Sequence, residues 1–341
     1  MSSARDAAAY RAAGVDLTAA DQVLRGIRKA VESTFGAGVV RGFGGFGGAV
    51  RVPEGLRRPV IVSSTDSVGT KVSIAAMAGV YDSVGWDIVN HCVNDVLVTG
   101  ALPLAFLDYV ASADLGPERT AAVIRGVAEA CRDAGCPLIG GETAELPGIY
   151  RPGEFDLAGF LIGVASEDDL IDTSRVRPGD AVVALPSNGL HTNGYSLARR
   201  VFQGVDLGHV YPELGRPLGD ELLAIHRSYL NDLKGLLPRV HAMAHITGGG
   251  LWDNIPRVLP EGVGVDLDWG TWQVPPIFDL MARLGGIEFK EMCRVFNMGI
   301  GMAVICAPED ADAFLNGVAG ASLAGRTRRA DGAGGRVRVL R

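Results

Sequence analysis

The sequence predicts an α+β fold with α/β-like alternation, divided into two domains. Three observations support this prediction. Apolar runs of strand length alternate with amphipathic helical patterns in both halves of the chain. A polar, turn-rich stretch at 166–180 separates the halves. The length of 341 residues suits roughly two domains of ordinary size. We therefore expect an N-terminal domain at 1–168 and a C-terminal domain at 169–341.

The first half opens its regular alternation with the strand-like run "RPVIVSS" at 58–64. The stretch "DIVNHCVNDVLVTG" at 87–100 places apolar residues on one helical face and stops at Gly100. Next comes "LAFLDYVAS" at 104–112, which predicts a strand with Asp108 in its middle. "PERTAAVIRGVAEACRDAG" predicts a helix that begins at Pro117 and ends at Gly135.

Two more strands complete the predicted N-terminal domain, namely "CPLIGGET" at 136–143 and "FDLAGFLIGVA" at 155–165. The second half repeats the mixed pattern. The expected elements are a strand at 181–186, helices at 195–202 and 251–259, a strand at 263–268, a helix at 276–285, a strand at 298–307, and a closing helix and strand.

Composition excludes several classes of protein. The net charge is -7 and no long basic run occurs, which argues against a nucleic-acid partner held by electrostatics. No run approaches 18 apolar residues, so we expect no membrane span. The five cysteines show no C-x-x-C pairing and lie in apolar stretches. Buried thiols in a reducing cytoplasm are therefore expected.

Carboxylates follow several apolar runs of the first half. They are Asp66 beside Thr65, Asp95 beside Asn94, Asp108, and Glu142 with Glu145 close behind. Ligand sites of α/β proteins lie beyond strand ends, and oxygen-only ligands suit Mg²⁺. The pattern indicates a metal–nucleotide site, although any one of these acids could be a helix cap or a solvated loop residue. The segment "TDSVGTK" at 65–71 resembles a phosphate-binding turn but is not a P-loop.

Glycine is used about twice as often as the usual ~7%, with 47 glycines in the chain. The cluster "GFGGFGG" at 42–48 could be a flap whose backbone N–H groups close over polyphosphate, or merely a mobile surface loop. The flap reading assigns nucleotide binding to Gly44, Gly45, Gly47 and Gly48.

Two loops of the second half share one design, a histidine and small residues before a helix start. They are "SNGLHTNGYS" at 187–196 and "HITGGGLW" at 245–252. Exposed N–H groups at such starts bind phosphate or carboxylate. His191 is expected to act at the site, His245 to be a structural residue, and His226 and His209 to have no particular role.

These motifs together resemble one family. The segments at 10–21, 44–48, 65–71, 92–111, 140–150, 189–197, 245–260 and 296–302 are similar, in order, to phosphoribosylformylglycinamidine cyclo-ligase, also called aminoimidazole ribonucleotide synthetase. "AGVD", "HTNGYSL" and "HITGGG" are the most specific of them. One departure is Ser67, where the family usually has glycine.

The resemblance implies a cytoplasmic homodimer in which the N-terminal sheets of two chains form a shared barrel, with ATP bound near it. It further implies that the N-terminal domain binds ATP and Mg²⁺ and that the C-terminal domain binds the substrate, formylglycinamidine ribonucleotide. By similarity, Mg²⁺ is expected on Asp66, Asp95 and Glu142, and ATP on Lys71 and the four flap glycines, with Thr65, Thr70 and Asn94 as further expected contacts. As hypotheses of our own, we assign substrate binding to His191, Thr192, Asn193, Gly248, Gly249 and Gly250, and catalysis to His191, Asp108 and Lys71.

The implied activity is an ATP-dependent C–N ligase of purine biosynthesis, which closes the imidazole ring and releases ADP and phosphate. Two alternatives stay open. One is another ATP-dependent phosphotransferase of the same superfamily, such as thiamine-monophosphate kinase. The other is a catalytically silent nucleotide-binding scaffold, against which the intact acids at 66, 95 and 142 weigh.

Overall fold

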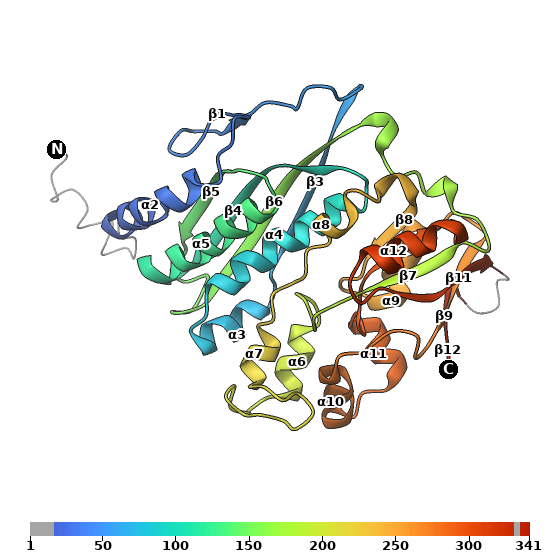
Figure 1. The fold of residues 1–341 in the computed structure, drawn as a ribbon. Coiled ribbons are helices and arrows are strands. Elements are labelled where there is room, and N and C mark those ends of the chain that lie inside the picture. The colour runs from blue at the N-terminus through green and yellow to red at the C-terminus, as the bar shows by residue number, and fades with distance from the viewer. Residues whose placement is uncertain (1–16, 331–334) are drawn as a thin grey trace.

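The computed structural model describes residues 17–330 and 335–341 (Figure 1). Residues 10–16 of the first resembling segment lie outside this range. The described chain forms two mixed α/β layers, one built on a four-stranded sheet and one on a six-stranded sheet. The predicted fold class is therefore confirmed.

The N-terminal sheet has the order β3-β6-β4-β5. Its strands are β3 (Pro59–Ser67), β4 (Leu102–Ser112), β5 (Leu138–Glu145) and β6 (Phe155–Ser166). Only the pair β4–β5 is parallel. Helices lie over one face of this sheet (Figure 1). They are α2 (Leu17–Glu32), α4 (Asp82–Leu97) and α5 (Pro117–Asp133), with the short α3 (Lys71–Ala78) at the end of the layer.

The C-terminal sheet has the order β12-β9-β11-β7-β10-β8. Its pairs are antiparallel apart from β12–β9. The strands are β7 (Ala181–Pro186), β8 (Val240–His245), β9 (Val263–Asp268), β10 (Ile300–Cys306), β11 (Ser322–Arg329) and β12 (Val337–Leu340). The helices are α6 (Tyr195–Val201), α7 (Leu218–Leu222), α8 (Leu230–Leu233), α9 (Gly250–Asn254), α10 (Pro276–Gly285), α11 (Phe289–Val295) and α12 (Ala311–Gly317).

Between the two sheets, the stretch 167–180 contains 3-10 turns at Glu167–Asp169 and Thr173–Arg175, as its turn-rich composition predicts. Further 3-10 turns span Leu237–Arg239, Ile255–Val258 and Pro308–Asp310. The helix expected over 251–259 is shorter than predicted, because Pro256 lacks the amide that would continue it.

Strands β1 (Val39–Arg41) and β2 (Ala49–Val50) form a small separate hairpin before the main sheet. The glycine-rich stretch 42–48 is the loop of this hairpin, and Phe46 on it is fully exposed. A side chain at Gly48 would meet the carbonyl oxygen of Ile139 at 2.5 Å, so only the end of the loop packs on β5.

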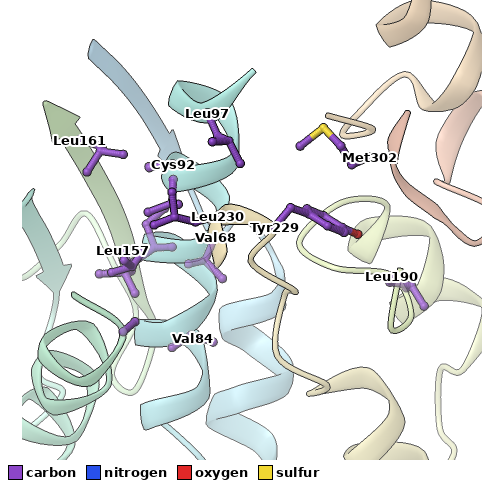
Figure 2. Packing of buried hydrophobic residues seen from close by; sticks show 14 of the residues in the cluster. Val68, Val84, Cys92, Leu97, Leu157, Leu161, Leu190, Tyr229, Leu230 and Met302 are labelled. Atoms are coloured by element: carbon purple, nitrogen blue, oxygen red, sulfur yellow. The ribbon is translucent and has the colours of Figure 1, made fainter. Parts of the chain in front are cut away.

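The hydrophobic core continues from one domain into the other. Figure 2 shows Cys92, Leu97 and Leu157 on the N-terminal side and Leu190 and Met302 on the C-terminal side, with Tyr229 and Leu230 between them. All five cysteines are buried and unpaired, as their apolar surroundings predict. In the described residues, no helix has both the length and the apolar character that crossing a bilayer requires.

In the part of the chain that the structure describes, no helix lies over the second face of the N-terminal sheet (Figure 1). Ile61 and Leu102 are in register with the intervening Val164 and therefore share a face, and both are exposed. Phe160 projects from the same face and is 43% exposed. The barrel between two chains stays a prediction, but this sheet has an open apolar face.

Candidate active site between the domains

Helix α4 and strand β3 bring Asp66 and Asp95 to the same imidazole. The Nε2 atom of His91 lies 2.9 Å from Asp66 Oδ2 and 3.7 Å from Asp95 Oδ2. His91 is buried, whereas the two carboxyl side chains are 40% and 27% exposed. His91 Nε2 meets no strict hydrogen-bond geometry among the described residues, yet it lies within ion-pair distance of Asp66. Two of the three predicted metal ligands therefore converge at one place.

The charges of this group are coupled. Burial disfavours the charged form of His91, but the hydrogen-bonding and charge of Asp66 and the charge of Asp95 outweigh it and raise the pKa of His91. Burial likewise opposes ionisation of both acids, and their histidine partners, His91 and His245, outweigh it and lower the pKa of each. An imidazolium between two carboxylates thus supplies positive charge where a cation could also bind.

Glu142 does not join the other two acids within one chain. Asp66 is in register with Gly159, then Asp108, then Gly141, so these four positions share the helix-covered face. Glu142 is the next residue along β5 and projects from the opposite face. It also lies three strands from β3, which is about 14 Å at ~4.8 Å per strand. The sequence placed it beyond a strand end, but β5 continues to Glu145.

Four histidines from separate segments meet where the domains touch. The ring of His226 is 4.0 Å from that of His191, 5.0 Å from His245 and 5.2 Å from His91, measured between centroids. His245 Nδ1 is 2.7 Å from Asp95 Oδ1, and its Nε2 is 3.0 Å from His226 Nε2. We expected His226 to have no particular role, but the structure places it at the centre of this group.

Thr192 connects two of these histidines through its hydroxyl group. The Oγ1 atom lies 2.6 Å from His91 Nδ1 and 3.3 Å from His226 Nδ1. Thr192 and His226 belong to the C-terminal domain, whereas His91 is on α4. The acid pair of one domain and the histidine loop of the other therefore form one continuous polar site.

His191 is buried and has a left-handed backbone with φ of 62°. Its Nε2 accepts a hydrogen bond from the Asn188 amide at 3.4 Å, which assigns the ring proton to Nδ1. Nδ1 finds no hydrogen-bond partner in the described part of the chain. Burial, aided by the positive charges of His245 and Lys71, lowers the pKa of His191 well below its usual value. The ring is thus a neutral imidazole with an unused N–H donor.

Lys71 lies elsewhere than the predicted phosphate contact requires. Its side chain is fully buried, and its Nζ atom forms a 2.7 Å ion pair with Asp87. The ammonium also donates to the carbonyl oxygens of His191 at 3.1 Å and Ala224 at 2.8 Å. An ammonium has three N–H donors, and here it makes two hydrogen bonds to carbonyl oxygens and one ion pair to a carboxylate. The nitrogen is therefore buried and enclosed by protein oxygens in this arrangement.

Asn94 is likewise buried, with its amide group engaged by the backbone of residues 227 and 229. Thr70 is half-buried and its hydroxyl lies 3.2 Å from that of Ser196 across the domain boundary. Thr65 projects from the open face of β3. The structure does not bring these three predicted nucleotide contacts together at one point.

Asp108 is buried on the helix-covered face of β4. A side chain at Gly141 would lie 2.1 Å from its Oδ1, so Gly141 provides the space that the carboxyl group occupies. Burial raises the pKa of Asp108 to about 7. It lies two strands from Asp66 in the sheet order, outside the histidine group.

The predicted substrate loops adjoin each other. A Cβ atom at Gly248 would lie 3.3 Å from Asn193 Oδ1. Gly249 and Gly250 both have positive φ, and a Cβ at Gly250 would meet the carbonyl oxygen of Cys293 at 2.1 Å. The amide of Asn254 holds the turn by donating to carbonyls of residues 247, 248 and 250. Glycine is required at 250 by both conformation and close packing.

Comparison with known proteins places this chain in a family. Residues 47–165 match the family AIR synthase related protein, N-terminal domain, and residues 177–330 match AIR synthase related protein, C-terminal domain. The chain is 48% identical over 310 residues to phosphoribosylformylglycinamidine cyclo-ligase of Thermoanaerobacter sp. strain X514, covering 90% of this chain and 92% of that protein. The chain belongs to the phosphoribosylformylglycinamidine cyclo-ligase family.

Other members of the family are similar to this chain to the same degree. The enzyme of the same name from Geobacillus kaustophilus is 48% identical over 311 residues, covering 89% of this chain and 90% of that protein. Solved structures give the same fold at lower identity. Thiamine-monophosphate kinase from Stenotrophomonas maltophilia K279a has a TM-score of 0.68 at 16% identity, over 92% of this chain and 95% of that one. Hydrogenase maturation protein HypE in complex with ATP has a TM-score of 0.64 at 18% identity, over 94% and 89%.

The sequence analysis gave no role at the site to His226 or to the α4 residues Asp87 and Asn90. One signal could have found the last two. Asp87, Asn90 and Asn94 are polar at spacing i, i+3 and i+7 in a helix whose other buried residues are mainly apolar, and such a stripe must be buried against polar groups. His226 carries no comparable signal, because its segment has no periodicity.

Proposed function

We propose that this chain closes the imidazole ring of formylglycinamidine ribonucleotide to give 5-aminoimidazole ribonucleotide, using ATP and releasing ADP and phosphate. Relatives that are 47–49% identical over about nine-tenths of the chain carry the name of this enzyme. The structural observation that carries the proposal is the meeting of the Asp66–Asp95 pair with His191 and its neighbours at the domain contact.

The reaction has one chief obstacle, because the oxygen of the formyl amide is a poor leaving group. In the proposed sequence that oxygen attacks the γ-phosphorus of ATP, the bond to the bridging oxygen breaks, and ADP leaves. An amidine nitrogen then attacks the formyl carbon and loses a proton, while the phosphorylated oxygen departs as phosphate. Such chemistry depends mostly on positioning and on neutralising charge.

His191 is the residue we assign to the reacting formyl group. It is neutral and buried, and its Nδ1–H is unused by the described protein, so it can donate to the formyl oxygen as that oxygen is activated. The ring can also relay a proton. Asp108 is a less direct candidate, because it is buried apart from the histidines. Asn193 and the turn Gly248–Gly250 adjoin, and we assign them to the substrate's ribose phosphate.

A divalent cation fits part of the predicted ligand set. Asp66 and Asp95 offer carboxylate oxygens at a shared, partly exposed place that already attracts positive charge from His91. Two carboxylates with substrate phosphates form a usual environment for Mg²⁺. Bound there, Mg²⁺ would neutralise the charge of the triphosphate oxygens. We do not extend this set to Glu142, since it projects from the other face of the sheet.

We further propose that two chains associate through the open face of the N-terminal sheet. Ile61, Leu102 and Phe160 are exposed on that face, and monomeric proteins rarely leave large contiguous apolar patches uncovered. ATP binding near this face, through the 42–48 loop, rests on the family resemblance, as does the cytoplasmic location.

The test is an ATPase assay with the purified chain. ADP should form with ATP and Mg²⁺ only when formylglycinamidine ribonucleotide is present, and 5-aminoimidazole ribonucleotide should appear in equal amount. ADP formed with thiamine monophosphate instead would favour a phosphotransferase. No ADP with either substrate would favour a silent nucleotide-binding scaffold.

A further inference from the structure

The segment 224–229, which we call the interdomain strap, lies along helix α4. It belongs to the C-terminal half of the chain and has no regular secondary structure before Leu230. Asp87 Oδ1 accepts a hydrogen bond from the His226 amide at 2.7 Å. Asn90 Nδ2 donates to the His226 carbonyl oxygen at 2.7 Å. One residue of the strap is thus fixed at both its backbone groups by α4.

Helix α4 makes further hydrogen bonds to the strap one turn along, at Asn94. Asn94 Nδ2 donates to the Arg227 carbonyl oxygen at 2.8 Å, and Asn94 Oδ1 accepts from the Tyr229 amide at 3.0 Å. Both groups of this buried amide are used. The polar stripe of α4 therefore forms a row of backbone contacts, which is how a buried extended segment satisfies its N–H and C=O groups.

Lys71 and Asp87 join this row to the loop that carries His191. The Lys71 ammonium donates to the carbonyl oxygens of Ala224, in the strap, and of His191, in the loop before α6. Burial lowers the pKa of Lys71 and raises that of Asp87, and the 2.7 Å contact between the two groups opposes both shifts. The two groups contact each other, and their remaining polar atoms bind the backbone.

His191 is the residue whose backbone most needs such support. It is one of three non-glycine residues with positive φ in the described chain. Few non-glycine residues adopt this conformation, and it persists only where the surroundings fix it. Lys71 donates to the carbonyl oxygen of His191 itself. The His191 ring stacks on the ring of His226, and the backbone amide of His226 donates to Asp87.

We propose that Lys71, Asp87 and Asn90 are positioning residues that fix His191 and His226 for the ring closure, and that Lys71 does not contact phosphate. A buried ion pair is weak evidence for stability, since its desolvation cost can exceed its attraction. Its use here is geometric. The pair connects two segments of the C-terminal domain to α3 and α4 of the N-terminal domain, and both segments carry a histidine of the site. This inference rests on the proposed function for its kinetic readout.

The decisive variant is Lys71→Met/Asp87→Asn, which removes both charges together and leaves neither buried alone. Its asparagine can still accept from the His226 amide, so the loss is confined to the two carbonyl contacts of Lys71. We expect kcat to fall at least tenfold, while the Kd for ATP with Mg²⁺, measured by calorimetry, stays within about twofold. The control Lys234→Met removes an exposed lysine and should leave both values unchanged.

A second variant covers failure of the first to fold. Asn90→Ala removes the hydrogen bond to the His226 carbonyl oxygen and no charge. It should lower kcat with unchanged ATP affinity, whereas Asn231→Ala, at an exposed asparagine, should not. Imidazole ¹H–¹⁵N spectra of the full chain should show altered His191 and His226 resonances in the first and second variants alone.

Two results would overturn the proposal. One is a loss of ATP affinity of tenfold or more in the double variant with kcat retained at saturation, which would make Lys71 a phosphate contact. The other is unchanged kcat and unchanged imidazole spectra in whichever of the two variants folds. The spectra and the ATP affinity are measured without turnover. Absence of ring closure by the unsubstituted chain would therefore count against the proposed function alone.

Discussion

His191 and His226 stack with ring centroids 4.0 Å apart and planes inclined by 24°. His191 belongs to the loop before α6 and His226 to the strap, which α4 holds. Because both rings are buried and both have pKa values lowered by burial, they meet as neutral rings. The stacked pair leaves His191 Nδ1 as an unused donor in the described site.

His191→Ala should lower kcat/KM by 10²- to 10⁴-fold, the usual contribution of a group that donates or moves a proton at the reacting centre. Steady-state kinetics with the ribonucleotide and ATP measures this. The matched control is His209→Ala, at an exposed histidine whose ring packs against Tyr211. If His191→Ala stayed within about twofold of the unsubstituted enzyme, a chemical role for this ring would be wrong.

Gly301→Ala should displace the His191 ring, because Gly301 packs against it. An added Cβ would lie 1.9 Å from Tyr229 Oη and 2.6 Å from His191 Cε1, so at least one of the two side chains must move. We expect kcat/KM to drop at least tenfold and stability to fall by about 1–3 kcal/mol, as for other overpacked sites. Gly235→Ala, where no heavy atom lies within 4 Å of the new methyl, is the control. A fully active Gly301→Ala enzyme would show that the packing around His191 is not restrictive.

Asp108 makes stability depend on pH in a direction that can be stated. Burial raises its folded-state pKa from 3.8 to about 7, so between these values the unfolded chain releases a proton that the folded chain keeps. Stability contributed by this group therefore falls as pH rises from about 4 to about 7. At pH 8, Asp108→Asn should raise the free energy of unfolding by up to about 4 kcal/mol and so unfold at a higher temperature than the unsubstituted chain, with no such gain at pH 4.

The check on Asp108 is thermal unfolding across this pH range. Asp114→Asn, at an exposed aspartate of the following turn, should leave the pH dependence unchanged. A gain for Asp108→Asn that is equal at pH 4 and pH 8 would contradict a raised pKa.

Asp66→Asn and Asp95→Asn should each raise the Mg²⁺ concentration that half-saturates ATP turnover by tenfold or more, because each removes one charge from the shared pair. Asp168→Asn, in a surface ion pair with Arg58, serves as the control.

Glu142→Gln is informative in either direction. Little effect agrees with its position on the other face of the sheet. An effect as large as that of Asp66→Asn would mean that the cation site is completed only when two chains associate.

Phe160→Glu should shift the chain from a dimer to a monomer, since it places a charge in the centre of the open apolar face. Light scattering coupled to size-exclusion chromatography gives the mass. Val210→Glu, at an exposed valine away from the sheet, should leave the mass unchanged. A dimer that survives both Phe160→Glu and Ile61→Glu would place the interface elsewhere.

The sequence predicted the parts of this fold that have a period. Strand β4 around Asp108 and helix α5 between Pro117 and Gly135 follow from alternation and from capping residues. It also singled out Asp66, Asp95 and His191, which the structure brings to the contact between the domains and whose roles stay predictions. It failed where position depends on register or on long-range contact. Glu142 follows an apolar run, but only the pairing of β5 with β4 shows which face it takes.

The histidine group illustrates the second kind of failure. Its four members stand at positions 91, 191, 226 and 245, and no local pattern connects them. The prediction that Lys71 contacts phosphate illustrates a related difficulty. A lysine after a glycine-containing turn is typical of phosphate binding, and only the packing of the second domain on α3 shows that its ammonium is already used.

Helix α4 binds the strap mainly through the strap's peptide groups, and of the strap's side chains that of His226 contacts α4. Ile225 is exposed and Ser228 is partly exposed, so we expect other side chains to be tolerated at these two positions. Proline is the exception. At 226 or 229 it would delete an amide that Asp87 or Asn94 needs, so the strap should tolerate nearly every exchange at its exposed positions while refusing an imino acid at these two.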